Sequence, residues 1–105
     1  MEDKVVVVAD KYTSLGFRLA GVEEAFPLEG REAEKKVEEL LGSEGVGIIV
    51  INEKLLASMD WRLKKRIESA AKPTVVAVPD KSGRAEEAES LKEMVKRALG
   101  FELLK

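Results

Sequence analysis

Three short runs of apolar, mostly β-branched residues constrain the fold of this chain more than any other feature. They are VVVVA at residues 5–9, VGIIVI at 46–51 and TVVAV at 74–78. Continuous apolar runs of this length are typical of strands that are buried on both faces, as they are inside a parallel sheet. Parallel neighbours need a long crossover, so helices are expected between the runs.

The segments between the runs carry the expected patterns. The clearest helix is REAEKKVEELLG at 31–42, which places apolar residues on one stripe and ends at a glycine. Shorter helices are predicted over 12–20, with Thr13 or Ser14 as N-cap, and after Asn52 and Asp60, whose side chains suit an N-cap. The polar stretch VEEAF at 22–26 precedes a proline and predicts a short edge strand.

The predicted order of elements is β-α-β-α-β-α-β-α, which indicates an α/β fold with a parallel sheet. With the two most apolar runs in the centre and right-handed crossovers, the fold is a doubly wound four-stranded sheet of order 2-1-3-4, flanked by helices and Rossmann-like or receiver-like. The 105 residues suit one domain, with a sheet core over 1–81 and a C-terminal helix and tail over 82–105.

The composition excludes several classes of function. The chain has no cysteine and no histidine, which removes disulfides, cysteine nucleophiles, Ser–His triads and the commonest metal ligand. A net charge of −2 gives no electrostatic reason to expect nucleic acid as a partner. No apolar run approaches the roughly 18 residues of a membrane span. We therefore expect a cytoplasmic protein with no catalytic, cofactor-binding or metal-binding residues and no direct membrane insertion.

In this fold the default ligand site is the crevice between the ends of the first and third strands, here lined by residues 10–13 and 52–54. A phosphate cradle needs glycine directly after the first strand, but ADKYTSLG has none before Gly16. The glycines of GSEGVG at 42–47 precede a strand and predict a helix stop and a turn instead. A small nucleotide-binding enzyme is therefore the weakest of three candidate functions.

A degenerate phosphoreceiver-like signalling or binding module is the alternative function, since receivers share this winding. A receiver needs an acidic pair after its first strand and a phosphoaccepting aspartate after its third. Here Asp10 is a single acid, and Asn52 occupies the acceptor position. Because an amide cannot accept the phosphoryl group, Asp10 is interpreted as a turn-former that accepts local N–H bonds and Asn52 as an N-cap.

Trp61 is the only tryptophan of the chain and follows Asp60 at a predicted helix start. It is predicted to cover part of the core, and a binding aromatic is the alternative.

Several segments resemble the F subunit of the archaeal and vacuolar-type rotary ATPases. The sequence AD at 9–10, followed by TSLGFRLAGVEEAF at 13–26, is similar to the N-terminal signature of that family, and the Gly-Phe-Arg-Leu-Ala-Gly block is complete at 16–21. VGIIVINEKLL at 46–56, PTVVAVPDKSG at 73–83 and VKRALGFEL at 95–103 are similar to later segments.

The resemblance implies a non-catalytic subunit of the central stalk, or rotor, of an A/V-type ATP synthase. Its implied partners are the coiled-coil shaft subunit and the catalytic head subunits, and it needs no cofactor. Its implied role is to help couple ATP synthesis or hydrolysis to proton or sodium transport, from a cytoplasmic position peripheral to the cell membrane.

The glycines of the block have a structural interpretation. Gly16 is expected to let a short helix pack close to the sheet, and Gly21 to supply a positive-φ stop before the edge strand. Leu19 and Ala20 are then expected to point inward.

Two further residues of the block are candidates for partner contact. Phe17 fits either the interior or the surface. Arg18 is expected to project outward, either to a carboxylate on a partner helix or to an acid of its own chain such as Glu23 or Glu24.

The tail FELLK after Gly100 is unusually apolar for a chain end. Either it folds back on its own domain, or it docks with the last helix on the coiled coil. In the second case the candidate contact residues are completed by Leu99, Phe101, Leu103 and Leu104.

Overall fold

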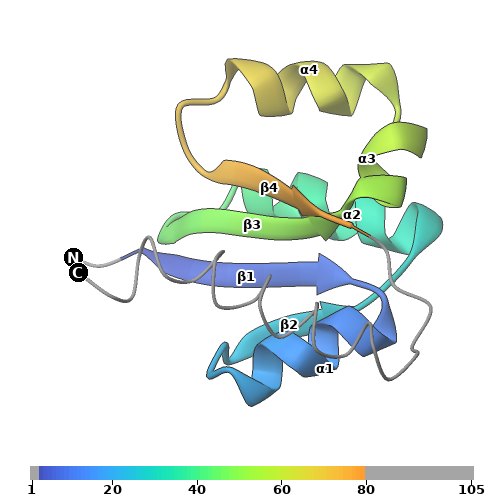
Figure 1. Cartoon of the computed structure of the whole chain (residues 1–105). Helices are drawn as coiled ribbons and strands as arrows, with labels where there is room; N and C mark the ends of the chain where they lie inside the picture. The colour runs from blue at the N-terminus through green and yellow to red at the C-terminus, as the bar shows by residue number, and fades with distance from the viewer. Residues whose placement is uncertain (1–2, 80–105) are drawn as a thin grey trace.

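The computed structural model describes residues 3–79, in which strands and helices alternate along the chain (Figure 1). The strands are β1 (Lys4–Ala9), β2 (Glu24–Pro27), β3 (Val46–Asn52) and β4 (Thr74–Val78). The helices are α1 (Lys11–Leu19), α2 (Gly30–Leu41), α3 (Glu53–Ser58) and α4 (Trp61–Ser69). The C-terminal helix and tail predicted over 82–105 lie outside the described residues.

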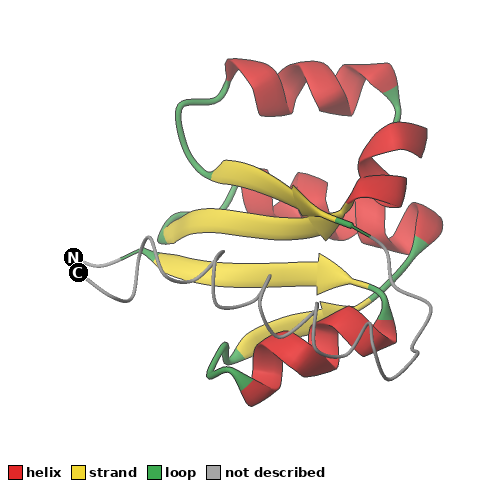
Figure 2. Cartoon of the chain, in the orientation of Figure 1, coloured by secondary structure: helices red, strands yellow, loops and turns green. Residues whose placement is uncertain are grey.

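The four strands are parallel and form one sheet of order β2-β1-β3-β4, which confirms the predicted fold class and strand order (Figure 2). Val7 of β1 lies in register with Ala25 of β2 on one side and with Val50 of β3 on the other. The central strands β1 and β3 are the most deeply buried, as their apolar runs predict. β4 is an edge strand of the described sheet and is mostly half-buried, less buried than its sequence suggests.

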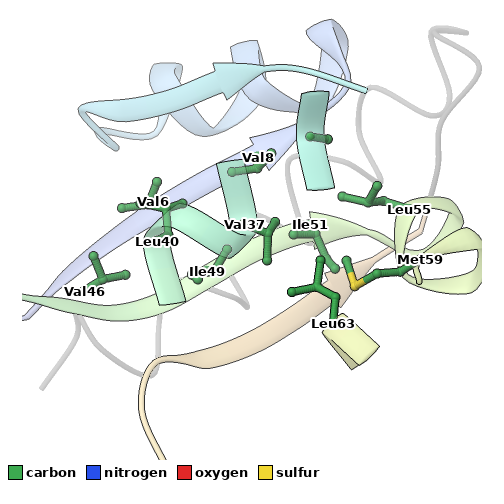
Figure 3. Packing of buried hydrophobic residues seen from close by; sticks show 11 residues of the cluster. Val6, Val8, Val37, Leu40, Val46, Ile49, Ile51, Leu55, Met59 and Leu63 are labelled. Atoms are coloured by element: carbon green, nitrogen blue, oxygen red, sulfur yellow. The ribbon is translucent and has the colours of Figure 1, made fainter. Parts of the chain in front are cut away.

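Alternate side chains of the central strands belong to two separate hydrophobic clusters. Helices α2, α3 and α4 contribute to the first, in which Val37 packs with Val6 and Ile49 (Figure 3). Helix α1 contributes Phe17 to the second, on the opposite face of the sheet. This division follows from a sheet whose chain winds first to one edge and then to the other.

Helix α1 begins one residue earlier than predicted because its N-cap is Asp10 rather than Thr13 or Ser14. The Asp10 carboxylate accepts a hydrogen bond from the backbone N–H of Thr13 at 2.9 Å. Thr13 and Ser14 instead lie within the helix and are buried.

The start of β3 contains an irregularity that the glycine pattern did not predict. Lys4 pairs with Val46 and Val5 with Ile48, so Gly47 is an extra residue on β3. A Cβ at Gly47 would lie 2.7 Å from the Cβ of Asp3, so this close approach favours glycine. The predicted helix stop is confirmed at Gly42, which follows α2 directly.

Candidate functional site

The carboxyl ends of β1 and β3 bring Asp10 and Asn52 together at the predicted crevice. The Asn52 side-chain amide donates to Asp10 Oδ2 at 2.8 Å, and Asn52 Oδ1 accepts from the Asp10 backbone N–H at 2.8 Å. The Asp10 carboxylate also accepts from the backbone N–H of Thr13 at 2.9 Å and from Thr13 Oγ1 at 2.8 Å. Both carboxylate oxygens therefore have partners within the chain.

This network confirms one prediction and corrects another. Asp10 is a turn-former whose carboxylate accepts local N–H bonds, as expected. Asn52 precedes α3, but its side chain makes no capping hydrogen bond and joins the two central strands instead. Asp60 likewise precedes α4 without a side-chain capping bond. The sequence thus predicts which residues precede the helices, but it does not predict the hydrogen-bond partner of each side chain.

The buried polar side chains of residues 3–79 form hydrogen bonds within the chain. Within this range, no buried side-chain nitrogen or oxygen lacks a hydrogen-bond partner, and no cluster of acidic residues is arranged to hold a metal ion. None of the helices in this range is long and apolar enough to cross a membrane.

Helix α1 presents a different surface from the one predicted. The ring of Phe17 is 0% exposed and packs in the core, so we remove Phe17 from the candidate contact residues. Leu19 is 80% exposed and Ala20 is also exposed, so the expectation that they point inward was wrong. Leu15, one helical turn before Leu19, is 52% exposed. An apolar pair that the sequence analysis missed therefore lies on the outer side of α1.

Hydrogen bonding explains why two polar residues of α1 face the sheet while two leucines do not. Ser14 Oγ donates to the carbonyl of Ala9 at 3.0 Å and lies 3.3 Å from the carbonyl oxygen of Phe26. Thr13 Oγ1 donates to Asp10. These hydroxyls satisfy backbone and side-chain acceptors at the strand ends, so they can be buried. The helical period then turns Leu15 and Leu19 outward.

Arg18 makes a contact that neither sequence alternative included. Its Nη2 donates to the backbone carbonyl of Ala25 at 2.9 Å, which ties α1 to the edge strand β2. Glu24, one of the two acids considered for Arg18, pairs instead with Lys4 at 2.7 Å. Gly21 has a φ of 110°, which confirms the predicted positive-φ stop between α1 and β2.

Trp61 does not cover the core. Its side chain is 65% exposed at the first residue of α4, with the Arg62 guanidinium carbon 5.5 Å from the ring centroid. The first buried residue of that helix is Leu63.

Comparison with known proteins identifies the family. The sequence model described as ATP synthase (F/14-kDa) subunit matches residues 5–95. The chain belongs to the family of ATP synthase F subunits. The F subunit of the A-type ATP synthase of Thermococcus kodakarensis is 41% identical over 105 residues, covering 95% of this chain and 97% of that protein. The corresponding protein of Methanothermobacter thermautotrophicus is 35% identical over 107 residues, covering 100% of both.

A solved structure of the same family supports the fold. The crystal structure of the F subunit of the V-type ATP synthase of Archaeoglobus fulgidus aligns with a TM-score of 0.67 at 28% sequence identity, covering 74% of this chain and 99% of that one. The resemblance inferred from the Gly-Phe-Arg block is thus confirmed. The chain is therefore a member of the ATP synthase F subunit family that is built on a doubly wound parallel sheet.

Proposed function

We propose that this chain is a non-catalytic subunit of the central stalk that binds the coiled-coil shaft subunit through the outer side of α1. The observation that carries the proposal is the exposed pair Leu15 and Leu19 in a member of this family. Exposing large apolar side chains to water is unfavourable in free energy, and a partner that buries them removes this penalty. Each leucine that becomes buried favours binding by about 1.5–3 kcal/mol.

The spacing of the pair suits a helical partner. Residues four apart lie on one side of a helix and form a short apolar ridge. Such a ridge packs into the groove between residues of another helix, as in a coiled coil. Two hydrogen bonds hold the helix that carries it, from Ser14 to Ala9 and from Arg18 to Ala25. Binding therefore costs little conformational entropy of the helix.

The charge of α1 indicates the character of the opposing surface. The helix contains Lys11 and Arg18 and no acidic residue. A shaft segment with acidic side chains beside its apolar seam is therefore the complementary partner. In this arrangement Arg18 keeps its hydrogen bond to Ala25, and its remaining N–H groups donate to acidic side chains of the shaft segment.

The apolar tail is proposed as a second part of the same interface. Leu99, Phe101, Leu103 and Leu104 lie outside the described residues and keep their role as candidate shaft contacts. Through this binding the chain would help couple ATP synthesis or hydrolysis in the catalytic head to proton or sodium transport. Its place would be cytoplasmic and peripheral to the membrane.

Co-expression with the coiled-coil shaft subunit encoded in the same genome, followed by gel filtration, tests the proposal. We expect one peak that contains both chains. Leu19→Asp should reduce co-elution strongly, because it places a carboxylate in the apolar ridge. Ser69→Asp is a matched control, since Leu19 and Ser69 are both exposed last residues of nine-residue helices. Separate elution of the wild-type chains, or equal behaviour of the two variants, would refute the proposal.

A further inference from the structure

Helix α4 carries an aromatic side chain that the rest of residues 3–79 leaves uncovered. Trp61 is 65% exposed and has the Arg62 guanidinium beside its ring. A solvated indole of this kind is unusual, because tryptophan is normally among the more buried residues. Tryptophan and arginine are also the residue types that contribute most to binding at protein interfaces.

The charges of helix α4 are mostly basic, although the exposed acid Asp60 directly precedes Trp61. Helix α4 contains the four basic residues Arg62, Lys64, Lys65 and Arg66 and one acid, Glu68, in a chain whose net charge is −2. Two of the basic groups have contacts within the chain, since Lys64 donates to the carbonyl of Ala57 at 3.5 Å and Arg66 pairs with Glu38 at 3.8 Å. Arg66 is nevertheless exposed, as are Arg62 and Lys65 near Trp61.

The orientation of α4 is fixed by its buried side. Leu63 is buried in the same cluster as the residues of α2 and β3, and Ile67 packs against that cluster. Trp61 and Lys65, four residues apart, therefore share the opposite side of the helix. Helix α4 lies beyond β4, at the opposite end of the sheet from α1 and β2 (Figure 1). We call Trp61, Arg62 and Lys65 the Trp61 face.

We propose that the Trp61 face is a second protein-docking surface, which receives an acidic segment of another ATP synthase subunit. The partner would supply an apolar pocket for the indole, with carboxylates placed to meet Arg62 and Lys65. The proposal is independent of shaft binding by α1, because the two surfaces lie at opposite ends of the sheet. A subunit with two such surfaces can contact two neighbours at once.

The charge density favours a protein over other anionic partners. Helix α4 has three exposed basic side chains, Arg62, Lys65 and Arg66. Arg66 is paired with Glu38, and the acids Asp60 and Glu68 lie nearby. These basic side chains are few compared with the clusters of four to eight that bind anionic membranes. They are also few compared with the 6–10 phosphate contacts that are typical of proteins bound strongly to nucleic acid. An aromatic anchor with two flanking cations instead matches the anatomy of a small protein interface.

The test uses the fact that the chain has one tryptophan. Chain labelled with 5-fluorotryptophan is mixed with the remaining soluble subunits of the ATP synthase from the same genome, and the ¹⁹F resonance is followed. We expect the resonance to shift and to lose its H₂O/D₂O isotope effect in the assembled complex. In the double variant Arg62→Glu, Lys65→Glu, the indole should stay accessible to solvent even where the chain still co-elutes.

Two controls separate a specific contact from a change in folding or net charge. Arg62→Lys and Glu68→Gln should keep the protected resonance, and far-UV circular dichroism checks that each variant is folded. A wild-type chain that co-elutes with a solvent-accessible Trp61 would overturn the proposal while leaving shaft binding intact. Protection of Trp61 by anionic phosphatidylserine vesicles or by self-association of the isolated chain, without protection in the complex, would also overturn it.

Discussion

At the scale of single residues, side chains at the strand ends determine the surface of this protein. Thr13 and Ser14 are buried because their hydroxyls reach acceptors on Asp10 and Ala9, and this leaves Leu15 and Leu19 exposed. Hydrophobicity alone predicts the reverse arrangement. The turn-forming role of Asp10 and the positive φ of Gly21 were predictable, because each depends on local backbone geometry. The partners of Asn52 and Arg18 were not, since they lie far along the chain or on a neighbouring strand.

The Asp10 network gives a prediction for stability. Asp10→Ala removes the N-cap of α1 and leaves the Asn52 amide without its acceptor, so we expect a loss of about 1–3 kcal/mol in the free energy of unfolding. Asp60→Ala, at an N-cap whose side chain makes no capping bond, should cost much less. Urea unfolding followed by circular dichroism measures both variants. Equal losses would show that the network contributes nothing beyond intrinsic helix preference.

Gly21 gives a second prediction at this scale. Its φ of 110° is strained for any residue with a Cβ, so Gly21→Ala should destabilise the fold by about 1–2 kcal/mol. Gly42 has an ordinary φ of −95°, and a Cβ there would make only normal contact with the Glu39 carbonyl, at 3.7 Å. Gly42→Ala should therefore change the unfolding free energy by less than about 0.5 kcal/mol. Parallel denaturant titrations compare the two, and a larger loss for Gly42→Ala would contradict the backbone argument.

At the scale of elements, apolar runs, helical apolar stripes, capping residues and Pro27 together predicted the described strands and helices. Runs such as VVVVA and VGIIVI identify central strands because both faces of a strand in the middle of the sheet must be apolar. The short helix α1 was the exception in orientation, since nine residues with apolar groups on several sides do not define one buried side. The edge position of β4 also depends on the whole topology rather than on its own sequence.

The orientation of α1 predicts that its leucines do little for the stability of the isolated chain. The double variant Leu15→Gln, Leu19→Gln should change the unfolding free energy by no more than about 0.5 kcal/mol, because both side chains are already exposed. Val37→Ala, at a fully buried position of α2, should cost about 2 kcal/mol. Thermal and urea unfolding distinguish these cases. A loss for the leucine variant as large as that for Val37→Ala would place the ridge in the chain's own core.

At the scale of the whole molecule, the alternating order of elements predicted the doubly wound sheet, and the Gly-Phe-Arg block led to the correct family. The predicted strand order already placed β2 and β4 at the two edges of the sheet. The sequence could not show which side chains of α1 and α4 stay exposed there, because Leu19 was expected to point inward and Trp61 to cover the core. At the carboxyl ends of β1 and β3, where this fold usually binds its ligand, Asp10 and Asn52 bond each other.

The hydrogen bonds of Asp10 and Asn52 predict that the chain does not transfer phosphoryl groups. Incubation with acetyl phosphate and Mg²⁺ should give no phosphorylated chain by intact mass spectrometry, because the acceptor position holds Asn52 and both Asp10 oxygens are hydrogen-bonded. Asn52→Asp is an informative companion variant, since it restores a carboxylate at that position. Stoichiometric phosphorylation of the wild-type chain at Asp10 would support the receiver-like alternative instead.

Site-specific crosslinking in the assembled ATP synthase tests the central claim most directly. The chain has no cysteine, so Leu19→Cys provides one unique site on the α1 ridge for a benzophenone maleimide. After illumination, mass spectrometry should find position 19 joined to the coiled-coil shaft subunit, whereas the control Ser69→Cys should not give that product. If the Leu19→Cys label joins only other subunits, or gives no crosslink while the chain remains in the complex, then α1 does not bind the shaft.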